Sequence, residues 1–218
     1  MTPSLAKVYE ALVARAADFS FEGIVAIVRE RFCARVGPFS PADPWFEERS
    51  AALWDRVLCE VELHARLTLE KRSSFSPEEL AVLAALLRAQ RGLFEASCPA
   101  HGEVDLTCLV TGAAFRLSKA DDAAQSLARA GEDGAALSGL LDAHVVATPE
   151  GVALLPGMLV HPPEAHEPIL ACLARARARS QPLAPTDVLD RLLAMRHRLG
   201  ARSRVKPHQV YRPEELDR

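Results

Sequence analysis

Thiol and imidazole side chains in the second half of the sequence could ligate zinc. Cys98 and His101 are separated by two residues, and His144, His161 and His166 follow in the same region. Cysteine and histidine are common zinc ligands. One C-x-x-H pair without a matching second pair is easily met by chance, so we interpret these residues as ordinary side chains and expect no bound metal or cofactor.

A histidine beside a carboxylate could act as a general base. His64 follows Glu60 by four residues on the apolar face of a predicted helix. Two interpretations are open: a base tuned by the carboxylate, or a histidine at the edge of the core with a satisfied hydrogen bond. We favour the second and expect no catalytic residue.

The sequence lacks the motifs of the common enzyme classes. It contains no GxxxxGK[ST] phosphate loop, no GxGxxG turn, no GxSxG elbow, no HExxH helix and no CxxC pair. Nucleotide hydrolysis, dinucleotide redox chemistry and the usual hydrolase mechanisms are therefore disfavoured, and we expect a protein that is not an enzyme.

An aromatic group is the first candidate for binding a partner. Trp45, Phe46 and Trp54 surround the start of a predicted helix. Tryptophan is enriched in the hot spots of protein interfaces. Core packing is the alternative interpretation of these side chains.

A basic C-terminal segment is the second candidate. Residues 1–174 carry 15 basic and 24 acidic side chains, a balance of −9, whereas residues 175–218 carry 11 basic and 5 acidic, a balance of +6. The segment could be a solvated helix face, a footprint for a phosphate backbone or a docking surface for an acidic partner. It could also be neutralised by the acidic part of the chain. We assign partner binding within it to Arg198, Arg202, Arg204 and Lys206.

The composition is that of an ordinary globular protein, with 49% hydrophobic and 25% charged residues. Five scattered cysteines suggest free thiols in a reducing compartment. The apolar runs are too short to cross a bilayer, and Lys7, Glu10 and Arg15 interrupt the start where a signal peptide needs an apolar core. We expect a soluble, cytoplasmic protein without a membrane partner.

Apolar periodicity predicts the elements that position these residues. Four helices are expected in the first 91 residues, the third running over residues 46–69 with Val57 and Val61 in its buried stripe. Ser76-Pro77-Glu78-Glu79 predicts a capped start for the fourth helix. Turn residues at Thr111-Gly112 and at 148–151 predict two hairpins.

The expected fold class is α+β. We predict an N-terminal helical bundle, a small antiparallel β module forming a curled sheet or barrel, and two C-terminal helices. The predicted divisions are residues 1–91, 92–161, 162–200 and a basic tail over 201–218.

Four segments of the chain carry a resemblance to a known family. They are DPWFEERSAALWDRVL (residues 43–58), RGLFEA (91–96), VALLPGMLVHPPEAHEPI (152–169) and SRVKPHQVYR (203–212). The chain resembles an uncharacterised family of single-copy proteins of motile soil-dwelling bacteria. The resemblance implies that the basic tail belongs to the protein, and it implies no activity, cofactor or catalytic residue.

These observations favour a non-enzymatic regulatory or adaptor protein that acts by binding another protein. The partner could belong to any signalling system, a small GTPase module included. The alternative is a nucleic-acid-binding protein that uses the basic C-terminal segment. A metal-dependent or otherwise cryptic enzyme is the third possibility.

Overall fold

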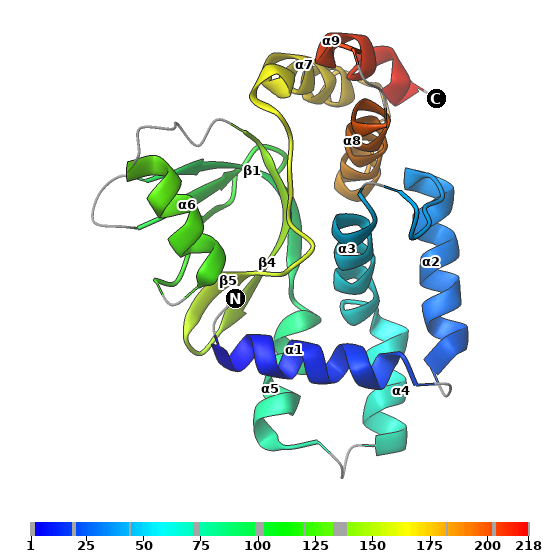
Figure 1. Ribbon diagram of the computed structural model, residues 1–218, viewed down its shortest axis with the longest axis vertical. Coiled ribbons are helices and arrows are strands. Elements are labelled where there is room, and N and C mark those ends of the chain that lie inside the picture. Colours follow the sequence, from blue (N-terminus) through cyan, green and yellow to red (C-terminus); the bar gives the residue numbers. More distant parts are fainter. Residues whose placement is uncertain are drawn as a thin grey trace.

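The computed structural model describes residues 3–18, 21–43, 45–71, 75–98, 103–119, 121–132, 139–181, 183–201 and 204–217. It confirms the α+β class: helices come first, a curled antiparallel sheet follows, and helices return at the C-terminal end (Figure 1). Within these residues no helix is long and apolar enough to span a bilayer. The domain divisions at residues 91, 161 and 200 stay predictions.

The N-terminal helices begin and end where local signals can be read. They are α1 (Pro3–Ala16), α2 (Glu22–Val36), α3 (Phe46–Leu58), α4 (Val61–Lys71) and α5 (Pro77–Leu86). The predicted capping box opens α5: Ser76 Oγ accepts the Glu79 N–H at 3.2 Å, and the Glu79 carboxylate accepts the Ser76 N–H at 2.8 Å. Pro77 occupies the first helical position, where its missing N–H costs no hydrogen bond.

The single long helix predicted over residues 46–69 is wrong, because the chain turns between α3 and α4. The Cys59 N–H is shared between the carbonyls of Asp55 and Arg56, at 3.1 and 3.2 Å, and the Glu60 N–H bonds to the Val57 carbonyl, three residues back, at 3.2 Å. Such tightened bonds are typical of a helix end. Neither residue is a glycine or a proline, so the sequence carried no visible breaker at this point.

The turn changes which side chains of α4 are buried. Val61 was predicted to lie in the buried stripe, but it is 66% exposed, and that prediction is wrong. Val57, in α3, is fully buried as predicted. His64 is also buried, with its ring nitrogen against the carbonyl of Leu58, which agrees with the interpretation of a core histidine.

The sheet contains both predicted hairpins. Its strands are β1 (Gln90–Ser97), β2 (Asp105–Cys108), β3 (Ala114–Arg116), β4 (Leu141–Thr148), β5 (Gly151–Leu154) and β6 (Leu159–Val160). The order is β3-β2-β1-β4-β5, with β6 paired to β4, and these strands pair with one another in antiparallel fashion. Gly112 and Gly151, in the two hairpin turns, have φ of 77° and 116°, which favours glycine.

One helix inside the β module was not predicted. The polar stretch after Lys119 contains α6 (Asp122–Glu132), which covers one face of the sheet (Figure 1). Buried Asp121 starts this helix by accepting the Ala124 N–H at 2.9 Å, and its other oxygen accepts the Leu154 N–H at 3.2 Å. The Asp121 carboxylate therefore joins α6 to β5.

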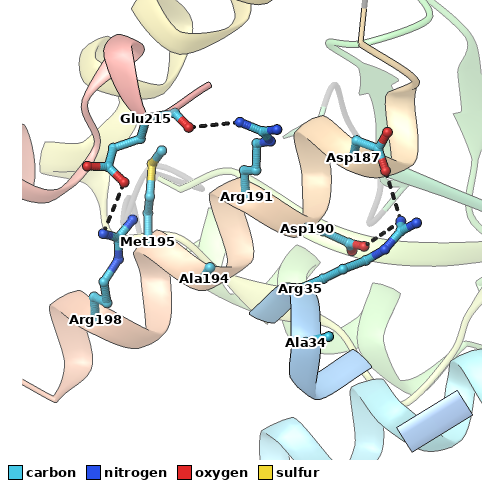
Figure 2. Close-up of a pocket in the computed structure, with 9 residues that line it drawn as sticks. All are labelled: Ala34, Arg35, Asp187, Asp190, Arg191, Ala194, Met195, Arg198 and Glu215. Atoms are coloured by element: carbon cyan, nitrogen blue, oxygen red, sulfur yellow. Dashed lines mark hydrogen bonds and ion pairs between the residues drawn. The ribbon is translucent and has the colours of Figure 1, made fainter. Parts of the chain in front are cut away.

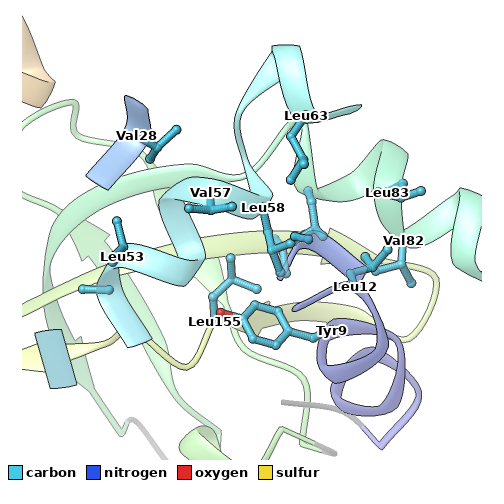
Figure 3. Close-up of a cluster of buried hydrophobic side chains, with 14 of the residues drawn as sticks. Tyr9, Leu12, Val28, Leu53, Val57, Leu58, Leu63, Val82, Leu83 and Leu155 are labelled. Carbon is cyan, nitrogen blue, oxygen red and sulfur yellow. The ribbon is translucent and has the colours of Figure 1, made fainter. Parts of the chain in front are cut away.

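The principal core lies between the N-terminal helices and the sheet. Tyr9, Leu12 and Leu58 meet Leu155, which follows β5, in one buried cluster (Figure 3). Leu193, from the C-terminal part of the chain, belongs to the same cluster. Residues far apart in sequence therefore complete the core of the first helices.

The C-terminal part folds back on itself. It comprises the 3-10 helix η3 (Pro163–Ala165), α7 (His166–Arg177), α8 (Pro185–Gly200), α9 (Pro207–Val210) and the 3-10 helix η4 (Pro213–Asp217). Val210, Tyr211 and Leu216 are buried in a second core cluster with residues of α7 and α8. The predicted basic tail is thus a folded segment where the structure describes it.

Candidate protein-interaction surfaces

A groove lies where α1, α2 and α3 meet. Its volume is about 530 Å³, and it is lined by Ala16, Ala17, Glu22, Val25, Ala26, Arg29 and Trp54. The alanines carry only methyl groups, so the half-buried Trp54 ring forms the bulkiest part of the lining. Glu22 and Arg29 are both exposed and are two turns apart on α2, about 10 Å along the helix. We name this feature the Trp54 groove.

The other two predicted aromatic residues are placed elsewhere. The Arg196 guanidinium lies 4.5 Å from the centre of the Trp45 ring. A side chain at Gly200 would meet that ring at 2.3 Å, so the start of α3 and the end of α8 are in close contact. Phe46 packs against Phe39 with ring centres 6.0 Å apart. The structure therefore does not bring Trp45 and Phe46 into the Trp54 groove.

Arginines of α7, of the segment just after it and of α8 hold the segment η4. Arg198 pairs with the Glu215 carboxylate at 3.2 Å, and Arg191 donates to the Glu215 carbonyl at 2.9 Å (Figure 2). Arg179 donates to the Leu216 carbonyl at 2.7 Å. Both Arg175 and Arg179 pair with Asp217, at 2.7 and 2.9 Å. The hydrogen bond from Arg175 holds the pKa of Asp217 below its ordinary value.

The remaining predicted basic residues precede α9. Arg204 and Lys206 are exposed, and Arg204 has a positive φ of 85°. The Lys206 N–H is accepted by the side chain of Gln209 at 3.1 Å, which starts the short helix. Arg202 lies outside the described residues. Among the predicted basic residues, Arg198 contacts η4, through the Glu215 carboxylate.

A cleft of about 590 Å³ separates α2, α8 and η4 (Figure 2). Its floor is formed by Ala34, Ala194 and Met195, and its charged lining consists of Arg35, Arg191, Arg198, Asp187, Asp190 and Glu215. Arg35 crosses from α2 to Asp187 at 2.8 Å. The three arginines face three carboxylates, so the lining carries no formal excess charge.

A buried charge network joins the three parts of the fold. Arg91 on β1 donates to both oxygens of Asp142 on β4, at 2.8 and 2.6 Å, and to Asp190 on α8 at 2.5 Å. Arg56 on α3 also pairs with Asp190. Burial alone would raise the pKa of Asp190, but the hydrogen bonds and charges of the two arginines lower it. Sequence patterns do not predict this network, although Asp142 stands out as a single charged residue in the apolar run Leu140–Ala147.

A second buried carboxylate joins α1, α3 and the sheet. Asp55 accepts the Tyr9 hydroxyl at 2.6 Å and the Gly157 N–H at 3.0 Å, and His144 Nδ1 lies 3.6 Å away. His144 lines a cavity of about 280 Å³ that also contacts Cys59. Burial raises the pKa of Cys59 to about 12. A thiol that stays protonated at neutral pH is no activated nucleophile, so this arrangement has the character of a structural contact.

The candidate zinc ligands are dispersed. Cys98 donates weakly to the Leu127 carbonyl at 3.9 Å, His161 bonds to the Tyr211 hydroxyl at 2.7 Å, and His166 lies 3.2 Å from Glu95. His101 lies outside the described residues. In the part of the chain that the structure describes, no group of three metal-binding side chains converges.

No protein-family model matches the chain, and comparison with curated proteins and with solved structures finds no match either.

Proposed function

We propose that the protein is a non-enzymatic regulatory or adaptor protein that binds another protein through the Trp54 groove. The observation that supports this most directly is the position of Trp54. Trp54 lines an open groove and has small side chains around it. A half-buried tryptophan offers a partner a large, rigid apolar surface at little cost in conformational entropy.

The lining suggests what the partner presents. Small apolar residues leave room for an aliphatic or aromatic side chain of the partner to rest against the indole ring. Glu22 and Arg29 carry opposite charges on the same helix and would fix the direction of an incoming segment through complementary charges. The proposed partner segment therefore has an apolar anchor between a basic and an acidic residue.

The test uses two matched alanine substitutions. Ala26→Glu places a charge in the groove, whereas Ala84→Glu places the same charge on an exposed position of α5, outside the groove. Both alanines are exposed helical residues, so both variants should keep the fold. Proteins captured from native lysate by the unmodified chain should be captured by Ala84→Glu and lost with Ala26→Glu.

A captured protein is then purified and its affinity measured by calorimetry. We expect Ala26→Glu to weaken binding at least tenfold relative to Ala84→Glu. Equal affinities for the two variants would refute the groove as the binding surface. Loss of binding in both variants would point to another surface of the protein.

A further inference from the structure

We infer that the arginine surface of α7 and α8 is a second binding site, for an acidic segment of a partner protein, and that η4 occupies this site in the free chain. The partner segment would carry a leucine between two carboxylates. The inference concerns a different surface from the Trp54 groove and does not rest on it. We name this feature the η4 site, formed by Arg175, Arg179, Arg191 and Arg198.

The chain itself shows how such a segment is recognised. Within residues 215–217, the two carboxylates of Glu215 and Asp217 pair with arginines of α8 and α7. Leu216, between them, is fully buried in the cluster that contains Leu173 and Leu192. The site therefore recognises an acidic–leucine–acidic sequence: the arginines pair with the two carboxylates, and the leucine side chain is the apolar anchor.

The site also binds the polypeptide backbone of this segment through hydrogen bonds. Arg191 donates to the carbonyl of Glu215 and Arg179 to that of Leu216. A phosphate backbone offers neither carbonyl groups nor a leucine side chain, so these contacts favour a protein segment over a nucleic acid.

The segment η4 is held by contacts that can be exchanged. It is a 3-10 helix of five residues, a conformation with poor hydrogen-bond geometry. Its ion pairs are partly exposed: the Arg175 and Arg198 side chains are 54% and 44% exposed, and their partners Asp217 and Glu215 are 35% and 18% exposed. Exposed ion pairs contribute little to stability because water competes for both charges. A partner segment with the same pattern would replace these contacts one for one.

Open space next to η4 allows a longer partner segment to make more contacts than η4 itself makes. The cleft of about 590 Å³ adjoins Glu215, and a second hollow of about 410 Å³ adjoins Asp217 beside Arg175 and Arg179. The cleft has an apolar floor at Met195, Ala194 and Ala34. A partner segment that extends past the acidic–leucine–acidic core could fill these spaces, which η4 leaves open.

The test measures binding of a labelled peptide to the full chain. The probe is a fluorescein-labelled peptide with the sequence of residues 212–218, RPEELDR. Fluorescence anisotropy should show weak binding to the unmodified chain, because its own η4 competes. Glu215→Gln/Asp217→Asn weakens η4 without removing Leu216, and this variant should bind the peptide at least tenfold more tightly.

Further variants separate the site from general charge attraction. In the weakened background, Arg179→Gln/Arg198→Gln should abolish the gain in peptide affinity. The control Arg88→Gln/Arg116→Gln removes two exposed arginines outside both proposed sites and should keep the gain. Ala26→Glu, which blocks the Trp54 groove, should also keep the gain in peptide affinity. The result is therefore independent of whether the Trp54 groove binds a partner. Circular dichroism confirms that each variant is folded.

The same affinity in the weakened and unmodified chains would overturn the inference. So would a gain that survives Arg179→Gln/Arg198→Gln. Displacement of the peptide by an equal concentration of an oligonucleotide would assign the η4 site to nucleic acid and overturn the assignment to a protein segment.

Discussion

Arg91 on β1 and Asp142 on β4 form a buried, two-point ion pair, in which the guanidinium donates to both carboxylate oxygens. The Arg91 side chain is 9% exposed and also reaches Asp190 on α8. One side chain therefore joins two strands to a C-terminal helix. Its removal would leave the buried Asp142 carboxylate without its two-point partner, whereas Asp190 would keep its pair with Arg56.

Arg91→Met should strongly destabilise the protein. Leaving buried charges unpaired costs about 3–5 kcal/mol, which exceeds the contribution of most single contacts. Urea denaturation followed by circular dichroism measures this loss. Arg116→Met is the control, because Arg116 pairs with Asp105 on the surface and should change the unfolding midpoint little. Equal midpoints for the two variants would contradict a structural role of the network.

Val57→Asp and Val61→Asp should differ sharply, although the two residues are four positions apart. Val57 is fully buried at the end of α3, so an aspartate there should cost more than about 3 kcal/mol of unfolding free energy. Val61 is exposed in the first turn of α4, where a negative charge interacts favourably with the helix dipole. Val61→Asp should therefore stay within about 0.5 kcal/mol of the unmodified chain. Thermal unfolding of both variants tests the turn at Cys59, since a continuous helix would make both changes costly.

Acidification should destabilise the protein before most carboxylates titrate. Burial lowers the pKa of His161 to about 4, and the charges of Arg196 and Arg91 lower it while that of Asp142 opposes them. Burial also lowers the pKa of His197 to about 3, helped by Arg49 and Arg196 and opposed by Asp142. Each histidine stays neutral in the folded chain but is protonated in the unfolded chain below about pH 6.5. The unfolded state then binds more protons, so stability falls as the pH decreases from about 6.5 towards 4.

Comparison of urea denaturation at pH 7.5 and 5.0 measures this effect. At pH 5 the buried, neutral His161 should lower the free energy of unfolding by on the order of 2 kcal/mol. In His161→Gln, the loss of unfolding free energy between pH 7.5 and 5.0 should be smaller by this amount. His208→Gln, at an exposed position of α9, should show the same drop as the unmodified chain. Identical drops for both variants would mean that His161 does not titrate in this way.

Purified protein should contain less than one equivalent of zinc. Cys98, His161 and His166 each contact a different partner, so their donor atoms do not share a site. Elemental analysis after dialysis measures the metal content. One retained equivalent that disappears in Cys98→Ala would show that Cys98 is a zinc ligand.

Binding to nucleic acid should be weak and without sequence preference. The four arginines of the η4 site already contact carboxylate or carbonyl groups of η4, which reduces their attraction for phosphate. Labelled oligonucleotides titrated at about 150 mM salt, where the Debye length is about 8 Å, should show no sub-micromolar complex. Selective sub-micromolar binding under these conditions would favour the nucleic-acid alternative over the adaptor.

Short-range signals predicted most of the elements. The capping box at Ser76 and the turn glycines at Gly112 and Gly151 act on their immediate neighbours, so they can be read from consecutive residues. The turn at Cys59 could not be read in this way, because it depends on tertiary packing and involves no glycine or proline. Helix α6 was missed although it has a local start signal, since Asp121 accepts the Ala124 N–H three residues on, as an N-cap side chain does.

The candidate surfaces were predicted less completely, because they depend on long-range pairing. The sequence shows that arginines are concentrated after residue 174, but it does not show that Glu215 and Asp217 contact them. Likewise, nothing local separates Trp54, which lines a groove, from Trp45, which packs against α8.

The shared core has a consequence for how the chain folds during synthesis. The cluster around Tyr9 and Leu12 is completed by Leu155 and by Leu193 on α8. When α1 to α5 leave the ribosome, these later residues are still to be translated, and the apolar faces of the first helices lack their partners. The emerging N-terminal half would therefore expose apolar surface until most of the chain has been made, so its folding has to wait for the end of synthesis.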